Sequence, residues 1–240
     1  MGPVVGRRER RLALLDRDAR RDGPAPQIAP GATAAHEEHG TREEVMITPG
    51  SAWGGDRRAL AALLYEGYAK KAAALRVDKE TALALLAEAL NLDRCYVAGR
   101  GEDAVGVVGL VEGRARALRL SFSLVRRHFG VLRSLAYTLL LSVRSWSRPA
   151  PDELVFESLA VSPGERGRGI GTRLVRQVED YAREHGYGSV GLEVTDSNHT
   201  AIRLYSRLGY VIVKTRRYPF VAHRAGFGGT HRMRKRLREA

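Results

Sequence analysis

The sequence predicts a single α/β domain built around a mixed sheet. Its 240 residues, 44% of them hydrophobic, are enough for one domain with a full core. From residue 153 onward, apolar strand patterns alternate with amphipathic helix patterns, and this alternation implies at least one parallel pair of strands. A glycine-rich turn near residues 162–169 joins one of these strands to the helix that follows.

The composition excludes several classes of protein. A single cysteine, Cys95, leaves no disulfide framework and no multi-cysteine zinc site, which indicates a reducing, cytoplasmic setting. The longest arginine-free apolar run, 135–143, is far shorter than the roughly 20 residues of a membrane-spanning helix. The N-terminal apolar run is too short for a cleaved secretory segment. The net charge of +13 permits a nucleic-acid-binding function, but the arginine bias beside many alanines is equally expected from a GC-rich genome.

Residues 1–41 are predicted to be a disordered, arginine-rich tail, because they combine charged runs with a Gly/Pro/Ala segment and lack apolar periodicity. A basic arm that binds phosphates is the alternative, but acidic residues spread through the segment weaken its field. His36 and His39 could face one metal ion from a single helical turn. With no third ligand nearby, we expect no metal site.

The folded domain is expected to cover residues 42–240. A strand-like run at 44–48 precedes Asp56, which is placed to cap a helix containing Leu60 and Tyr68. A second helix follows at 81–92. Two β-rich runs, separated by three turn residues, then predict a hairpin. These runs are 95–100 and 104–113.

A helical insertion is predicted at about 114–150, where leucines recur near helical spacing, arginines form a basic face, and prolines end the segment. The alternating elements of the second half follow it. They are strands at 153–161, 189–196, 210–215 and 232–237, and helices at 170–185 and 199–208.

The turn before residue 170 should bind a phosphate, because amides at a helix N-terminus attract anions and glycines allow close approach. A Walker loop would need lysine where Ile170 stands. A Rossmann loop would need glycine where Thr172 stands, and an acidic residue at a strand end, whereas Glu193 lies inside its strand. Both nucleotide motifs are therefore excluded.

The pattern that fits is Arg-x-x-Gly-x-Gly at 166–171, preceded by LAVSP and followed about 20 residues later by LEVTDSNHTAIRLYSRLGY. In this order the two motifs resemble the GNAT acetyltransferase superfamily, over about residues 43–237. The resemblance implies a GNAT-like domain: a mixed, mostly antiparallel sheet with one splayed parallel strand pair, flanked by helices. It also implies that acetyl-CoA, or a related acyl-CoA, binds where those two strands separate.

The resemblance also assigns residues to the cofactor. Backbone groups of Leu159, Ala160 and Val161 would pair with the pantetheine arm, and Asn198 would contact the cofactor from the adjacent strand end. Arg166 and Arg168 would add charge, although a solvated role for either is the alternative. The amides expected to hold the pyrophosphate belong to Gly167, Arg168, Gly169, Ile170, Gly171 and Thr172.

Acyl transfer to an amine requires the neutral nucleophile, and deprotonating a lysine-like amine at pH 7 costs about 4.6 kcal/mol. A carboxylate inside an apolar strand suits the role of base, because desolvation raises its pKa. Glu157 and Glu193 both qualify. Similarity to the ribosomal-protein alanine N-acetyltransferase branch implies Glu193 as the base and Tyr205 as the acid that protonates the leaving thiolate. The alternative for Glu193 is a carboxylate paired at a strand edge, and the alternative for Tyr205 is an aromatic side chain that only packs. Glu157 and Glu193 are not mutually exclusive as bases, because water can relay the proton.

The insertion departs from the family pattern, in which a short hairpin occupies its place. Family topology leads us to expect it at the same end of the sheet as the loop between the last two strands, 217–230, where it would wall the acceptor site. Its basic, amphipathic character also permits peripheral contact with an anionic membrane, although packing on the sheet is the favoured interpretation.

The sequence thus predicts an acetyl-CoA-dependent N-acetyltransferase that transfers the acetyl group directly to an amine, without a metal or a covalent intermediate. The acceptor is a protein N-terminus, a lysine or a small-molecule amine, and neither it nor the oligomeric state can be read from the sequence. The alternatives are a nucleic-acid-binding protein that uses its basic termini and a non-catalytic acyl-CoA sensor. The ordered motif pair favours the enzyme.

Overall fold

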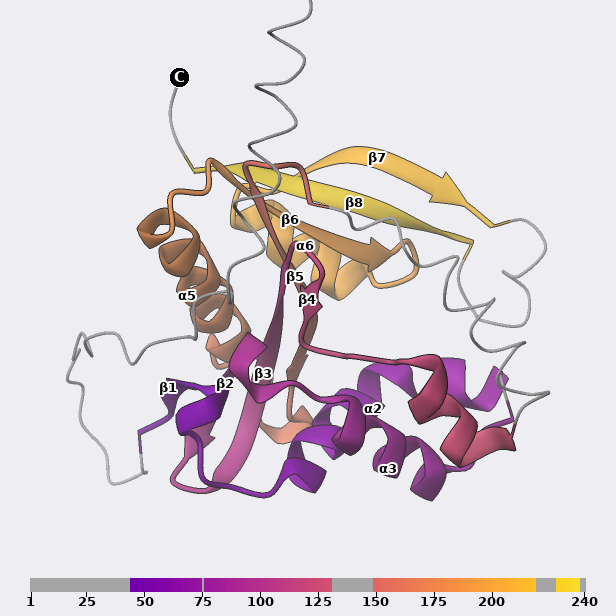
Figure 1. Cartoon of the computed structure of the whole chain (residues 1–240). Coiled ribbons are helices and arrows are strands. Elements are labelled where there is room, and N and C mark those ends of the chain that lie inside the picture. The colour runs from indigo at the N-terminus through magenta and orange to yellow at the C-terminus, as the bar shows by residue number, and fades with distance from the viewer. Residues whose placement is uncertain (1–43, 75, 131–148, 219–227, 238–240) are drawn as a thin grey trace, which may run out of the picture.

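A computed structural model describes residues 44–74, 76–130, 149–218 and 228–237 of the chain (Figure 1). They form one eight-stranded sheet in the order β1-β2-β3-β5-β6-β8-β7, with β4 beside β3. Every pair of neighbouring strands is antiparallel except β5 and β6, which are parallel. This arrangement confirms the predicted mixed sheet. The strands are β1 (Met46–Pro49), β2 (Cys95–Arg100), β3 (Asp103–Glu112), β4 (Ala115–Arg116), β5 (Glu153–Val161), β6 (Ser189–Thr195), β7 (Val211–Arg217) and β8 (Gly229–Arg236).

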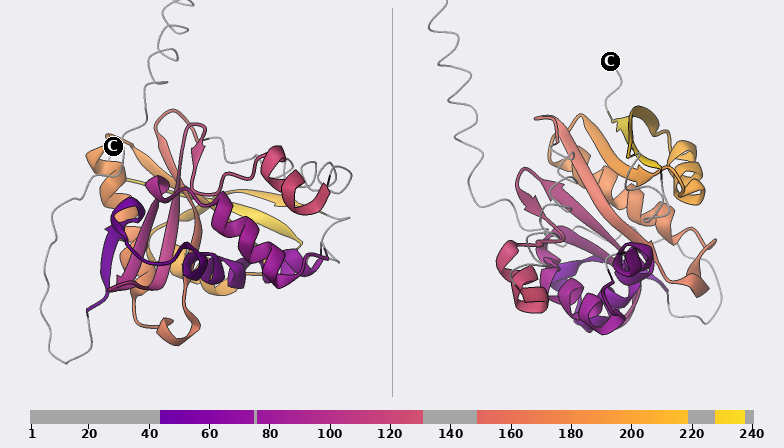
Figure 2. Two further views of the ribbon diagram at one scale, coloured as in Figure 1. Left: turned by 60° about the horizontal axis from the view of Figure 1, so that its bottom comes forward. Right: turned by 90° about the vertical axis from the view of Figure 1, so that its right-hand side faces the viewer.

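Helices cover both faces of the sheet (Figure 2). On one face, α2 (Arg57–Ala74) and α3 (Lys79–Ala89) pack over β2 and β3; we call this the α2–α3 face. On the other, the α5–α6 face, lie α5 (Ile170–Glu184) and α6 (His199–Arg207). Alternate side chains of β2 enter the two cores, because successive side chains of a strand point to opposite faces. This explains why β2 reads as a continuous apolar run.

Local capping explains where the first two helices begin. The carboxylate of Asp56 accepts a hydrogen bond from the backbone amide of Arg58 at 2.8 Å, as expected from the sequence. The carboxylate of Asp78 accepts one from the amide of Thr81, also at 2.8 Å. The second helix therefore starts at Lys79, two residues earlier than the apolar pattern predicted.

The parallel pair separates partway along its length. Its register runs from Glu153 opposite Ser189 to Phe156 opposite Leu192 and ends there. Beyond this point β5 continues beside β3 as far as Val161, whereas β6 continues beside β8. The predicted splay of the two strands is therefore present.

The insertion differs from its prediction in two ways. Residues 115–116 form strand β4 rather than the start of a helix, and the helix that the structure describes here spans 122–130. The expected position at the end of the sheet near the loop between β7 and β8 is wrong. The insertion follows β3 and enters β5 at Glu153, which lies opposite Ser189 at the start of β6, whereas β8 begins beside the end of β6. The two connections thus meet the sheet at opposite ends, because β5 is parallel to β6 whereas β8 is antiparallel to it.

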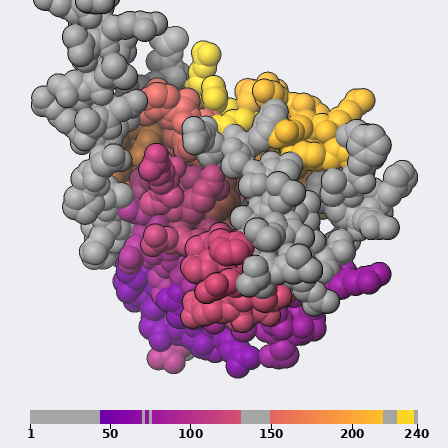
Figure 3. Space-filling view, turned by 45° about the vertical axis from the view of Figure 1, so that its right-hand side comes forward, coloured from indigo at the N-terminus to yellow at the C-terminus, as the bar shows by residue number. Residues whose placement is uncertain are grey.

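The insertion then packs against the protein. The backbone bridge between Leu90 and Leu118 ties its first part to the end of α3, and Leu124 is buried in the core of the α2–α3 face. Figure 3 shows this part of the chain on the surface beside the first helices. The described residues of the insertion therefore pack on the protein, as the favoured interpretation predicted. Residues 131–148 lie outside the described part. Within that part, no helix is both long and apolar enough to cross a membrane.

Candidate active site

A β-bulge marks the place where β5 leaves β6. Val107 of β3 pairs with Ala160 and Gly109 pairs with Glu157, so β5 carries one more residue than β3 over this stretch. Ser158, in the bulge, has a φ of 60°, a left-handed conformation that is rare for a residue other than glycine. The extra residue shifts the side-chain alternation of β5 by one position.

The effect of this shift is visible in the two cores. Before the bulge, Phe156 packs into the core of the α5–α6 face; after it, Leu159 and Val161 pack against that same core, while Ala160 packs against the other. Without an extra residue, positions 156 and 159 would face opposite sides. The bulge thus sets the orientation of the segment expected to meet the pantetheine arm.

The glycine-rich turn follows directly. A 3-10 turn at Pro163–Glu165 leads to Gly167 and Gly169, whose φ angles of 79° and 81° fall in the region that glycine alone adopts without strain. Helix α5 begins at Ile170, and the amide of Arg173 donates to the carbonyl of Gly169 at 3.0 Å. The amides of residues 170–172 precede this first helical bond, so they are available to an anion.

Arginine side chains hold the turn rather than extending freely from it. Glu165 accepts two hydrogen bonds from Arg100 of β2, at 2.9 and 3.0 Å, and a third from Arg168 at 3.3 Å. The Nε of Arg166 donates to the carbonyl of Val161 at 3.1 Å. Arg166 therefore closes the turn onto the end of β5, and Arg168, 47% exposed, keeps guanidinium donors at the surface.

Tyr205 lies beside the point of strand separation. Its ring meets that of Phe156 edge-on, with centroids 5.7 Å apart, and Phe156 belongs to the last pair before β5 and β6 part. The side chain is 6% exposed, and burial raises the pKa of the phenol above its ordinary value. Asn198, at the start of the same helix, is exposed and accepts a hydrogen bond from the amide of Ala201 at 3.1 Å, which caps α6.

The two candidate carboxylates lie on the α2–α3 face, opposite Tyr205. Glu157 is occupied by the insertion: Arg116 donates to one of its oxygens and the amide of Leu118 to the other, both at 3.4 Å. Glu193 alternates with buried residues of the α5–α6 core and so points to the opposite face, where it is half-buried. Among the residues placed by the structure, none bonds to the Glu193 carboxylate.

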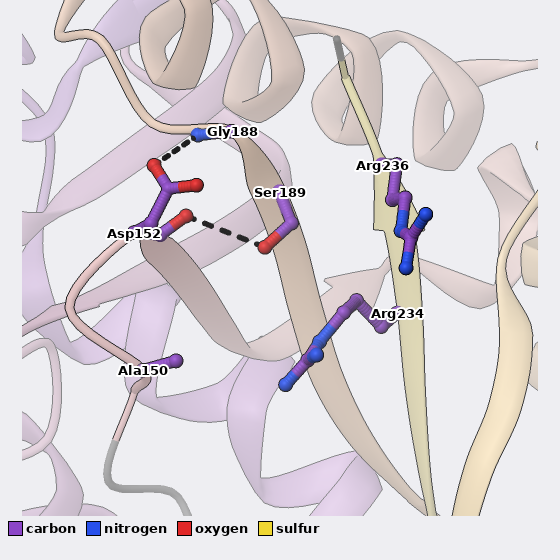
Figure 4. A pocket seen from close by; sticks show the side chains of 6 residues that line it. All are labelled: Ala150, Asp152, Gly188, Ser189, Arg234 and Arg236. Atoms are coloured by element: carbon purple, nitrogen blue, oxygen red, sulfur yellow. Dashed lines mark hydrogen bonds between the residues drawn. The ribbon is translucent and has the colours of Figure 1, made fainter. Parts of the chain in front are cut away.

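A cavity of about 330 Å³ lies at the other end of the parallel pair (Figure 4). Asp152 and Ser189, at the starts of β5 and β6, line it together with Arg234 and Arg236 of β8. Asp152 is bonded to the amide of Gly188 at 2.7 Å. The cavity thus lies where the strands are paired, away from their separation, and it does not include the candidate catalytic residues.

Other chemistry is sparse in the described parts of the chain. They contain no group of three or more His, Cys, Asp or Glu side chains placed to hold a metal ion. His36 and His39 lie outside them. Cys95 is buried, and desolvation, with a smaller contribution from Glu157, raises the pKa of its thiol to about 12. A thiol of this kind is a poor nucleophile at neutral pH.

Part of the C-terminal basic run is paired within the fold. Arg232 and Arg234 both pair with Glu153, whose side chain is fully buried, and Lys235 pairs with Glu179 at 2.7 Å. These three side chains are engaged within the fold, which weakens the support that the basic C-terminus gives to the nucleic-acid-binding alternative.

Two features of the described residues define the structural class of this protein. The sheet opens at its one parallel strand pair, and a turn with amides available at the start of a helix lies beside the opening. It is an α/β protein with a glycine-rich turn next to an opening in its sheet. The chain belongs to the Acetyltransferase (GNAT) family, whose profile matches residues 64–210.

Individual relatives are similar over a shorter stretch. Streptothricin acetyltransferase of Streptomyces lavendulae is 43% identical over 70 residues, which cover 29% of this chain and 35% of that protein. N-alpha-acetyltransferase RimI of Mycobacterium tuberculosis is 41% identical over 70 residues, 29% of this chain and 42% of that one. The chain thus matches between about a third and two fifths of the length of these relatives. A solved acetyltransferase structure, 20% identical, superposes with a TM-score of 0.51 over 80% of this chain and all of that one, which shows a shared fold.

Sequence reasoning missed the residues that support the site. Arg100 and Arg116 come from neighbouring strands and pair with glutamates more than 40 positions away in the chain, so no local pattern points to them. Tyr68 appeared only as one apolar position of a helix, yet its hydroxyl lies 3.1 Å from that of Ser158. The bulge at Ser158 has no signal in the sequence, because serine rarely adopts its conformation.

Proposed function

We propose that this protein is an acetyl-CoA-dependent N-acetyltransferase that moves an acetyl group directly to an amine. The observation that carries the proposal is the separation of β5 from β6 after the pair Phe156 and Leu192, with the glycine-rich turn immediately downstream on β5. The opening exposes the edge of β5 to an extended ligand, and the turn offers amides to an anion.

The residues present fit such a cofactor. A Cβ atom added to Gly167 or Gly169 would meet nothing within 4 Å, so the turn leaves open space for phosphate oxygens. Backbone groups of 159–161 would hold the pantetheine arm, and the amides of 167–172 the pyrophosphate. When bound, the cofactor supplies an acyl group activated as a thioester.

Glu193 is the better candidate for the base. Both oxygens of Glu157 already accept hydrogen bonds from the insertion, so they are less accessible to an incoming amine. Glu193 is half-buried beside the strand separation and keeps its oxygens open on the same face. In this mechanism Glu193, directly or through water, removes the proton that the amine loses as the C–N bond forms.

Tyr205 suits the complementary role of acid. Burial raises the pKa of its phenol, so the group stays protonated at neutral pH and can give its proton to the departing sulfur as the C–S bond breaks. Tyr205 and Glu193 lie on opposite faces of the sheet, so the amine would approach from the α2–α3 face while the thiol leaves on the α5–α6 side.

The acceptor is an amine, and its identity stays open between a peptide N-terminus, a lysine and a small molecule. The matched relatives include a streptothricin acetyltransferase and an N-alpha-acetyltransferase, so their names point to different acceptors. The insertion, through Arg116 and Leu118, reaches Glu157 on the acceptor face and is where specificity of this chain would arise.

Release of free thiol from acetyl-CoA tests the proposal, with peptides, lysine derivatives, polyamines and aminoglycoside-like amines as acceptors. Amine-dependent release that saturates with acceptor is expected. Calorimetric binding of CoA without turnover on any amine would instead support the acyl-CoA sensor. Absence of CoA binding would refute the assignment of the cofactor site.

A further inference from the structure

The contact between Tyr68 and Ser158 joins the first helix of the domain to the bulge in β5. Their hydroxyl oxygens lie 3.1 Å apart in a partly buried setting, 90 positions apart in the chain. Either hydroxyl can donate. Helix α2 packs along β3 and β5, so Tyr68 reaches the bulge from the α2–α3 face.

A contact from another element can stabilise the strained conformation of Ser158. Its φ of 60° is strained for any residue other than glycine, and regular pairing of β5 with β3 would remove the bulge. A hydrogen bond from a neighbouring element stabilises the side chain only while the residue stays in this conformation. Tyr68 therefore opposes the loss of the bulge.

The bulge in turn decides which way the next three residues face. Leu159 and Val161 pack toward the α5–α6 core and Ala160 toward the other, a pattern that requires the extra residue. Val161 also supports the glycine-rich turn, through its carbonyl bond to Arg166 and the proximity of its side chain to Gly171. A shift of one position in β5 would disturb both the orientation of residues 159–161 and the support that Val161 gives to the turn.

We propose that Tyr68 is a positioning residue for the acyl-CoA site: through Ser158 it holds the bulge that orients the 159–161 segment toward the cofactor. The proposal rests on the acyl-CoA-dependent function proposed above. Tyr68 touches neither the cofactor nor the reacting atoms in this role, and it acts through the backbone of β5.

The test compares five variants of the full chain with the wild type by CoA calorimetry. Tyr68→Phe and Ser158→Ala each remove the hydrogen bond, and each should raise the Kd by about 2- to 13-fold, the range expected for one hydrogen bond. The double variant Tyr68→Phe/Ser158→Ala should lose no more than either single one. Tyr68→Phe/Ser158→Gly should regain most of the affinity, because glycine adopts the bulge conformation without strain. Tyr65→Phe, on the same helix, is the matched control and should bind as the wild type does.

Two outcomes would overturn the proposal. One is an unchanged Kd in Tyr68→Phe; the other is a loss that Ser158→Gly fails to restore, which would mean that the effect does not pass through the bulge. A lowered melting temperature with unchanged Kd would likewise assign Tyr68 to stability alone.

Hydrogen exchange of the ligand-free protein separates this proposal from the proposed function. Tyr68→Phe should speed exchange of the amides around 159–161 relative to Tyr65→Phe, and adding Ser158→Gly should slow it again. If the wild type failed to bind CoA, the proposed function would fall, while exchange would still decide whether Tyr68 holds the bulge. Unaltered exchange would refute that role.

Discussion

The carboxylate of Glu153, on β5, lies directly over Gly191, on the neighbouring strand β6. Because glycine has no side chain, the carboxylate crosses β6 and pairs with Arg232 and Arg234 on β8. Glu153 is fully buried, so its oxygens depend on these arginines and on the amide of Ala150, which donates to the carboxylate at 3.1 Å. Three strands are thereby joined at the paired end of β5 and β6, just before the two strands separate.

Replacing Gly191 with alanine should destabilise the protein by about 1–3 kcal/mol. The new Cβ would overlap an oxygen of Glu153 and displace the carboxylate from its arginines. Urea unfolding measures the loss. Gly67→Ala is the control, because a Cβ there meets nothing within 4 Å and alanine favours the helix, so equal or greater stability is expected. Equal stabilities of Gly191→Ala and wild type would show that the carboxylate can move without loss.

Gly169→Val should weaken CoA binding about tenfold or more, as measured by calorimetry. Valine is strained at the φ of 81° and would displace the start of α5 together with its free amides. Gly171→Ala is the matched control: its Cβ would lie 3.6 Å from Leu204 and 3.7 Å from Val161, ordinary contacts, so affinity should be kept. Undiminished affinity in a folded Gly169→Val variant would remove the turn from the cofactor site.

Tyr205→Phe should lower kcat by about 10²- to 10⁴-fold while leaving the fold and CoA affinity intact. The ring still packs against Phe156, and only the proton donor is lost. The decrease should be smaller for an acyl donor with a more acidic leaving thiol, since a better leaving group needs less protonation. An unchanged kcat under conditions where chemistry limits would assign Tyr205 to packing.

Glu193→Gln and Glu157→Gln should separate the two carboxylates. Glu193→Gln should reduce kcat by about 10²- to 10⁴-fold with a lysine-like acceptor, and less with an α-amino group whose pKa is nearer 8. Glu157→Gln should mainly reduce stability, because it weakens the contacts with Arg116 and Leu118. Steady-state kinetics and melting temperatures of both variants distinguish the two roles. A large loss of kcat in Glu157→Gln, with kcat kept in Glu193→Gln, would make Glu157 the base.

The protein should lose stability at alkaline pH, beginning near pH 9. Burial raises the pKa of the Cys95 thiol from 9.0 to about 12, so the unfolded chain releases this proton before the folded one does. The thiol's contribution is therefore complete below pH 9 and is lost between pH 9 and 12, by up to about 1.4 kcal/mol per pH unit. Urea unfolding from pH 8 to 11 should show a shallower decline for Cys95→Ala than for wild type. Parallel declines would contradict this contribution.

Much of the fold was predictable because its signals are local. The alternation of strands and helices after residue 153, the hairpin of β2 and β3 and the cap at Asp56 each depend on residues close in sequence. The insertion was the main error. Leucines at helical spacing predicted a helix from residue 114, but pairing with β3 made 115–116 a strand, because edge hydrogen bonds of a neighbouring strand outweigh a weak local preference.

By itself, the sequence determined the motif order, the glycine positions and the residues of the turn, since these follow from backbone conformations that only certain residue types adopt. Tertiary structure alone decided what each side chain meets. It pairs Glu157 with Arg116, leaves Glu193 open, sets Tyr205 against Phe156 and brings Tyr68 to the bulge at Ser158. These contacts join residues 41 to 90 positions apart, or depend on strand register, and such long-range geometry is set by the packing of the whole sheet rather than by any local pattern.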